Sequence, residues 1–100
     1  MSYALELRKE AVIEFTSAFI WYEEQKDNLG ENFKTAVERK LKLICKNPYQ
    51  YKSTYKKYHE AATDKFSFLI VYIINEVDKR VVVFAIFHTS RNPKRKYLKK

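Results

Sequence analysis

The sequence predicts one α+β domain in which a two-helix hairpin packs on a small antiparallel sheet, in the order strand, helix, helix, strand, strand, strand. Two observations support this fold class. Residues 9–46 carry apolar side chains at helical spacing, and residues 66–91 concentrate β-branched and aromatic residues in two short runs. One glycine and two prolines leave little room for long loops, so residues 1–100 are expected to form a single domain.

The first half of the chain predicts a strand and two helices. Residues 3–8 alternate modestly between apolar and polar side chains, as in a half-exposed strand. From Lys9 the period becomes helical, and the expected inward stripe contains Ala11, Val12, Phe15, Ala18, Phe19, Trp21 and Tyr22. Asn28 and Gly30 end this helix, and a second one runs to Asn47 and Pro48. The short link makes the two helices antiparallel.

The second half predicts the rest of the sheet. Residues 49–58 interleave tyrosines with lysines, which suits a partly exposed third strand. Residues 68–74 and 81–87 are unbroken apolar runs joined by a polar turn, so they form a hairpin at the centre of the sheet. The side chains expected in the middle of the core are Ile70, Tyr72, Val83 and Ala85.

Charge is unevenly distributed along the chain. Residues 1–31 hold seven acids and three bases, a net −4, whereas residues 32–100 hold five acids and 17 bases, a net +12, which together give +8. A basic tail begins at about residue 91. It attracts polyanions or an acidic protein, or it is simply a solvated tail.

Several classes of protein are excluded by composition. The single cysteine, Cys45, cannot form an internal disulfide and falls in a helical apolar pattern, which suits a reducing cytoplasm. No apolar run approaches the roughly 20 residues that span a bilayer, so no membrane association is expected. The usual clustered spacing of metal ligands is absent, and one glycine cannot build a nucleotide-binding loop. No metal and no cofactor is therefore expected.

A set of short motifs resembles the RelE/ParE toxin superfamily, most closely its ParE-like, plasmid-stabilisation branch. In chain order they are Trp-Tyr-Glu-Glu-Gln at 21–25, Leu-Gly at 29–30, Asn-Pro at 47–48, Phe-Ser-Phe at 66–68 and Ala-Ile-Phe-His-Thr-Ser-Arg-Asn-Pro at 85–93. The resemblance covers nearly the whole chain. It implies a toxin that an acidic antitoxin, encoded beside it, holds inactive in a tight complex.

The two branches of this superfamily imply different activities. ParE-like toxins are associated with poisoning DNA gyrase, whereas RelE-like toxins cleave messenger RNA on the ribosome. Arg91 and Tyr97 match positions of the ribonuclease set, and they are the catalytic residues expected if the chain is an endoribonuclease. Leu69 stands where that set has an arginine, and Ala61 to Asp64 replace its basic cluster, which disfavours a phosphate site.

The leading hypothesis is a ParE-like toxin that acts by binding. Its expected target-binding residues are His59, His88, Arg91, Lys94, Arg95 and Lys96. His88 could instead anchor the turn after its strand, and Arg91 could pair with a helix acid. Because His59 and Glu60 replace arginines that many relatives carry, a non-toxic relative that retains only antitoxin binding stays a third hypothesis.

Overall fold

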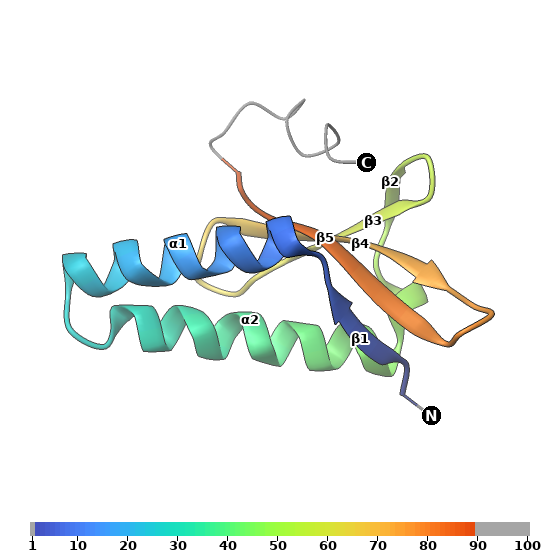
Figure 1. Cartoon of the computed structure of the whole chain (residues 1–100), viewed down its shortest axis with the longest axis horizontal. Coiled ribbons are helices and arrows are strands. Elements are labelled where there is room, and N and C mark those ends of the chain that lie inside the picture. Colours follow the sequence, from blue (N-terminus) through green and yellow to red (C-terminus); the bar gives the residue numbers. More distant parts are fainter. Residues whose placement is uncertain (1, 90–100) are drawn as a thin grey trace.

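The computed structural model describes residues 2–89, apart from the side chain of Thr54. The elements are β1 (Ala4–Leu7), α1 (Lys9–Gln25), α2 (Leu29–Lys46), the short 3-10 helix η1 (Pro48–Gln50), β2 (Ser53–Tyr55), β3 (Tyr58–Ala62), β4 (Phe68–Asn75) and β5 (Arg80–His88). Figure 1 shows α1 and α2 running antiparallel as a hairpin along one side of the sheet. The predicted fold class and the order of its elements are confirmed.

Within the described residues the strands form one five-stranded sheet in the order β1-β5-β4-β3-β2. The antiparallel hairpin of β4 and β5 lies at its centre, as predicted. The antiparallel arrangement holds for β2 to β5, whereas β1 pairs parallel with β5. Both helices and the other three strands lie between β1 and β5 along the chain, so no tight turn forces these two strands to run antiparallel.

The strand expected over residues 49–58 begins later than predicted. Pro48 opens η1 instead, since its fixed φ suits the first turn of a helix. The chain then forms the three-residue β2 and turns at Lys56, whose φ is 52°. The strand that pairs with β4 is β3, with His59 opposite Tyr72 and Ala61 opposite Ile70.

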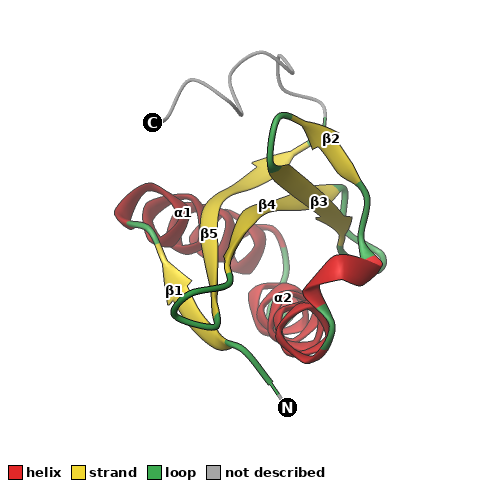
Figure 2. Ribbon diagram, turned by 90° about the vertical axis from the view of Figure 1, so that its right-hand side faces the viewer, coloured by secondary structure: helices red, strands yellow, loops and turns green. Residues whose placement is uncertain are grey.

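The main core lies between the helices and the sheet, and Figure 2 shows the strands curving over α2 seen end on. Ile70, Tyr72 and Val83 are fully buried in this core, as predicted, whereas Ala85 is fully buried in a smaller cluster on the other face of the sheet. Phe33 of α2 is also fully buried, in a cluster of aromatic rings from both helices and the sheet. No helix among residues 2–89 combines the length and apolar character needed to cross a bilayer.

The inward stripe of α1 is narrower than predicted. Ala11 is fully buried, and Phe15, Phe19 and Tyr22 pack against the core. Trp21, expected in the core, is 55% exposed, because it lies about 100° around the helix from Tyr22. Val12 is 43% exposed for the same geometric reason, and Ile13 and Ile20 are also exposed. α1 therefore exposes several large apolar side chains, with polar residues such as Thr16, Ser17 and Glu24 among them.

The helix-to-helix link depends on three residues in roles that the sequence only partly revealed. α1 ends at Gln25 with Lys26 as its C-cap, and Asn28, which adopts the left-handed conformation with a φ of 71°, precedes the first turn of α2. Gly30 lies inside the first turn of α2, where an added Cβ would be 2.4 Å from the Cγ of Glu23 and 2.7 Å from the carbonyl oxygen of Phe19. The carboxylate of Glu23, a residue outside the predicted inward stripe of α1, accepts hydrogen bonds from the backbone N–H groups of Asn28 and Glu31.

Replacing Gly30 with alanine is expected to lower the free energy of unfolding by about 1–3 kcal/mol, because the methyl group must displace the backbone of α1. Urea unfolding followed by circular dichroism measures the change. Ala36 lies on α2 beside a groove lined by Asp64, Lys65 and Phe66, and Ala36→Ser provides the control. Equal stability of the Gly30→Ala variant and the wild type would contradict this close packing.

Candidate functional site

The two histidines predicted to bind a target both lie on the helix-facing side of the sheet but are not brought together. His59 of β3 pairs with Tyr72, and His88 of β5 pairs with Phe68. These partners are four residues apart on β4, a separation of about 13 Å along the strand. The other predicted site residues, Arg91, Lys94, Arg95, Lys96 and Tyr97, lie outside the described residues.

His59 is held by an internal network. Its ring stacks on Tyr72 with 5.2 Å between centroids, and its Nδ1 lies 2.8 Å from the carbonyl oxygen of Tyr51. Because a carbonyl only accepts, Nδ1 carries the proton in this contact. The buried Tyr72 hydroxyl donates to the carbonyl oxygen of Pro48 at 2.6 Å. His59 therefore anchors the segment around η1 to the sheet, a structural role that the sequence did not reveal.

His88 borders a groove between α1 and the end of the central hairpin. Its ring meets Phe68 edge to face, with 5.0 Å between centroids. The groove has a volume of about 440 Å³, and besides His88 and Phe68 it is lined by residues from the second half of α1: Ser17, Ala18, Trp21 and Tyr22. An exposed indole and a mainly apolar lining make this a place for an apolar side chain of another protein.

A glutamate of α1 completes the hydrogen bonding of β5 beyond the end of β1. Leu7 of β1 is the last residue paired with β5, opposite Val83. Three residues later, the backbone N–H of Ile86 donates to Oε1 of Glu14 at 2.9 Å. The carboxylate thus takes the place of a strand partner, which fixes the part of β5 that leads to His88. Glu14 lies outside the inward stripe that the sequence predicted for this helix, so this contact was missed.

The sheet face away from the helices is apolar at its centre. Val71, Ala85 and Phe87 form a second buried cluster, with Tyr58 packed against it. Leu69, which the resemblance placed at a ribonuclease arginine position, is half-buried opposite Phe87. The guanidinium of Arg8 lies 5.3 Å from the centroid of the Phe84 ring on β5. The centre of this face is therefore apolar and buried, with the Arg8 guanidinium beside it, whereas a ribonuclease would need several cations around a phosphate.

The opposite end of the central hairpin carries a cluster of hydrogen bonds around Glu76. Its carboxylate pairs with Lys79 at 2.7 Å and accepts hydrogen bonds from the hydroxyls of Tyr3 and Tyr49. The bonds from Lys79, Tyr3 and Tyr49 lower the pKa of Glu76 to about 2, and the bond to Glu76 raises the pKa of Tyr49 to about 12. This cluster fastens the N-terminal segment and η1 to the turn between β4 and β5.

Acid is expected to weaken this cluster. The pKa of Glu76 is lower in the folded chain than its ordinary value of 4.5, so its contribution to stability is present above that value and is lost as the pH falls towards about 2. The midpoint of urea unfolding, measured from neutral pH down to about 2, should decrease less steeply for Glu76→Gln than for the wild type. Parallel curves for the two proteins would contradict the expectation.

Metal binding finds no support in the described side chains. Residues 2–89 contain no group of three or more His, Cys, Asp or Glu side chains placed to hold a metal ion. Burial raises the pKa of the Cys45 thiol, which keeps it protonated and weakens it as a ligand or nucleophile.

Comparison with solved structures identifies the fold. A chain of the chromosomal ParDE toxin-antitoxin system from P. aeruginosa superposes with a TM-score of 0.75 and 10% identity, over 87% of this chain and 96% of that one. A chain of the intact E. coli RelBE toxin-antitoxin complex gives 0.69 and 16%, over 90% and 100%. The isolated E. coli RelE toxin gives 0.68 and 15%, over 94% and 92%. The fold is therefore the one shared by ParE and RelE toxins.

Sequence comparison decides the family. No sequence among curated proteins is significantly similar to the chain. The family model described as the ParE toxin of the type II toxin-antitoxin system, parDE, matches residues 5–93. This match spans every helix and strand described above except the first residue of β1. The chain belongs to the ParE toxin family of type II toxin-antitoxin systems.

Proposed function

We propose that the chain is a toxin that inhibits growth by binding DNA gyrase in the cytoplasm, and that a cognate acidic antitoxin neutralises it. The observation that carries the choice of a binding mechanism is the apolar outer face of the sheet. Val71, Ala85 and Phe87 are buried at its centre, and Leu69 lies half-buried opposite Phe87, so these side chains cannot stabilise the charge of a phosphate. The ribonuclease reading also needs Arg91 and Tyr97 as catalytic residues.

The proposal of an antitoxin partner rests on exposed apolar surface and on charge. α1 exposes at least half of the side chains of Ile13, Ile20 and Trp21. Apolar surface in contact with water is unfavourable in free energy, and a partner that covers it removes this cost. The net charge of +8 favours an acidic partner over a basic one. A toxin that outlasts its antitoxin would also stabilise a plasmid carrying the pair.

The test is induced expression of the chain with and without the product of the adjacent reading frame. Growth should stop only without that product, and the purified chain should inhibit supercoiling by gyrase in vitro. Messenger RNA from the induced cells should remain intact when mapped by primer extension. Cleavage of messenger RNA on ribosomes without an effect on gyrase would establish the ribonuclease instead. Normal growth on induction would identify a non-toxic relative.

A further inference from the structure

A row of aromatic rings crosses the outer face of the sheet, which is the face away from the helices. Tyr55 of β2 stacks on Tyr58 of β3, with 6.4 Å between the ring centroids and 15° between the ring planes. Tyr58 in turn meets Phe84 of β5 edge to face at 5.5 Å, although β4 lies between their two strands. Tyr58 also packs against the buried apolar cluster at the centre of this face. These three rings, the aromatic row, therefore form one continuous surface from β2 to β5.

A β-bulge places Phe84 in the aromatic row. The pairing of β4 with β5 shifts register between Val71 and Tyr72, and Phe84 is the residue of β5 that is left without a partner on β4. Because a bulge puts two neighbouring side chains on the same face, the Phe84 ring shares the outer face with Ala85. Bulges are frequent beside functional sites, where they change the direction of one side chain. This bulge completes the row at its β5 end.

Two cations lie at the ends of the aromatic row. The Nζ of Lys56 lies 5.3 Å from the centroid of the Tyr55 ring, and the guanidinium carbon of Arg8 lies at the same distance from the centroid of Phe84. A cation over a ring keeps N–H groups that can still bind an anion. Residues 52–57, which include β2 and its turn, contain three lysines and no acid. Both ends of the row are therefore complementary in charge to acidic groups.

This arrangement fits an acidic protein segment better than a nucleic acid. A nucleic acid carries a phosphate at every nucleotide and needs cations along its whole path. The centre of this face instead holds the buried Val71, with Glu60 paired opposite it on β3. Bases also need a free ring face for stacking, whereas the ring of Tyr55 already stacks within the row and has Lys56 over it.

We propose that the aromatic row is the surface by which the toxin binds gyrase, and that it holds an extended segment of gyrase with acids at both ends and apolar side chains between them. The acids pair with Lys56 and Arg8, and the apolar side chains lie on the rings. The successive distances along the row put these two cations at most about 23 Å apart, which an extended segment of about seven residues spans. Tyrosine, phenylalanine and arginine are enriched at protein interfaces, which supports this use. The inference rests on the proposed function, because it assumes that gyrase is the target.

The first experiment measures the binding of variants to purified gyrase in the absence of DNA. Tyr55→Ala removes the ring at the β2 end of the row, which is 43% exposed. Arg8→Glu reverses the charge at the other end, and an acid is compatible with this position because Arg8 is the N-cap of α1. Lys56→Asn removes the remaining charge and tolerates the φ of 52°. Each variant should bind gyrase at least about tenfold more weakly than the wild type.

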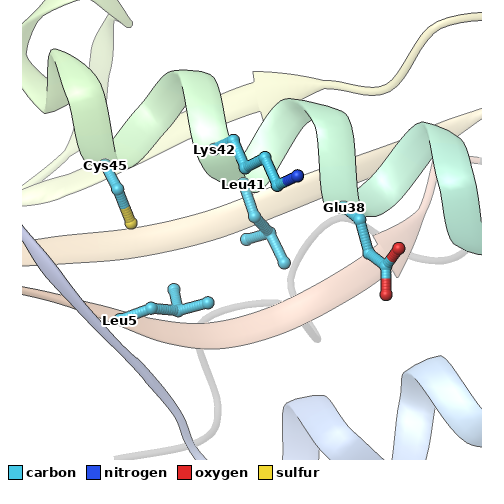
Figure 3. A pocket seen from close by; sticks show the side chains of 5 residues that line it. All are labelled: Leu5, Glu38, Leu41, Lys42 and Cys45. Carbon is cyan, nitrogen blue, oxygen red and sulfur yellow. The ribbon is translucent and has the colours of Figure 1, made fainter. Parts of the chain in front are cut away.

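The matched control changes the same amount of charge in the helix layer. Lys42 lies on α2 in a groove that Leu5 and Cys45 also line, as Figure 3 shows. Lys42→Glu should therefore weaken binding by less than about threefold, through long-range attraction alone. Circular dichroism melting verifies that all variants are folded. A loss for Lys42→Glu as large as that for Arg8→Glu would show that net charge, and not the row, determines binding.

A second measurement does not depend on loss of affinity. Tyr55→p-benzoylphenylalanine keeps an aromatic side chain and should form a crosslink to gyrase under ultraviolet light, whereas Lys42→p-benzoylphenylalanine should not. Mass spectrometry of the linked peptide should identify a segment of gyrase with at least two acids within about seven residues. A linked segment without acids, or crosslinking from position 42 alone, would overturn the inference.

The outcomes distinguish this inference from the proposed function. If the wild type inhibits gyrase and the folded Tyr55→Ala and Arg8→Glu variants bind it equally well, the aromatic row is not the binding surface and gyrase remains the target. If the wild type does not bind gyrase, both proposals fail. Fluorescence anisotropy with single-stranded and duplex oligonucleotides tests the other class of partner. Oligonucleotide binding that these two substitutions weaken, with gyrase binding unchanged, would assign the row to a nucleic acid and overturn the inference.

Discussion

Replacing Arg91 with alanine is expected to abolish growth inhibition while the chain stays folded and still binds its antitoxin. Arg91 follows the central strand β5, which ends at His88. Its planar guanidinium can hold a carboxylate or phosphate in a fixed geometry, whereas the lysines that follow mainly provide long-range attraction. Colony counts after induction measure toxicity, and copurification with the antitoxin measures binding.

The controls for Arg91 separate geometry from charge. Arg91→Lys keeps the charge but loses the fork, so it should restore little toxicity if geometry matters. Removal of residues 94–100, which takes away Lys94, Arg95 and Lys96, should weaken toxicity in proportion to lost charge. A toxic wild type whose Arg91→Ala variant inhibits growth equally would show that this residue is not part of the site.

Tyr97→Phe distinguishes the two mechanisms with the same assay. A general acid or base cannot function without its hydroxyl, so a ribonuclease should lose most of its rate. A chain that binds gyrase should keep most of its toxicity, because phenylalanine preserves the ring. We expect the second result. Loss of toxicity in Tyr97→Phe, together with loss of messenger cleavage, would favour the enzyme.

Sequence patterns predicted those parts of the fold that local chemistry determines. Two apolar runs joined by a polar turn predict the central hairpin. Apolar side chains at helical spacing predict the helices, and two of them, Phe33 and Val37, are buried in the structure. The parallel pairing of β1 could not be predicted, because it depends on contacts between residues about 76 positions apart, such as Ala4 with Arg80. The strand expected from residue 49 starts later because Pro48 favours the first turn of a helix, a local signal that the sequence analysis used only to end α2.

The candidate site was harder to predict than the fold. His59 and His88 stood out in the sequence as the two titratable imidazoles, but their stacking on Tyr72 and Phe68 follows from strand register. The role of Glu14 has no sequence signal, since a glutamate on an amphipathic helix is normally solvated. The aromatic row could be recognised only from the structure, because Tyr58 and Phe84 meet across β4.

Phe33→Ala is expected to have the largest effect on stability among these variants. Phe33 is fully buried, and its ring centroid lies 4.9 Å from Phe68, 5.2 Å from Tyr22, 5.5 Å from Phe66 and 5.6 Å from Phe15. It therefore joins both helices to the sheet. Truncation leaves a cavity among rigid rings and should cost about 3–5 kcal/mol. Most small domains are stable by only about 5–15 kcal/mol, so the variant should be partly or fully unfolded at 37 °C, about body temperature.

Trp21→Ala is the matched control, because it removes an even larger aromatic side chain from the helix that packs on Phe33. Trp21 is 55% exposed, so its truncation should change the free energy of unfolding by about 1 kcal/mol or less. Urea unfolding of both variants measures the contrast. A cost for Trp21→Ala similar to that for Phe33→Ala would mean that α1 packs through the wider stripe that the sequence suggested. If instead Trp21→Ala is stable but binds the antitoxin weakly, Trp21 is part of the surface of α1 that the antitoxin covers.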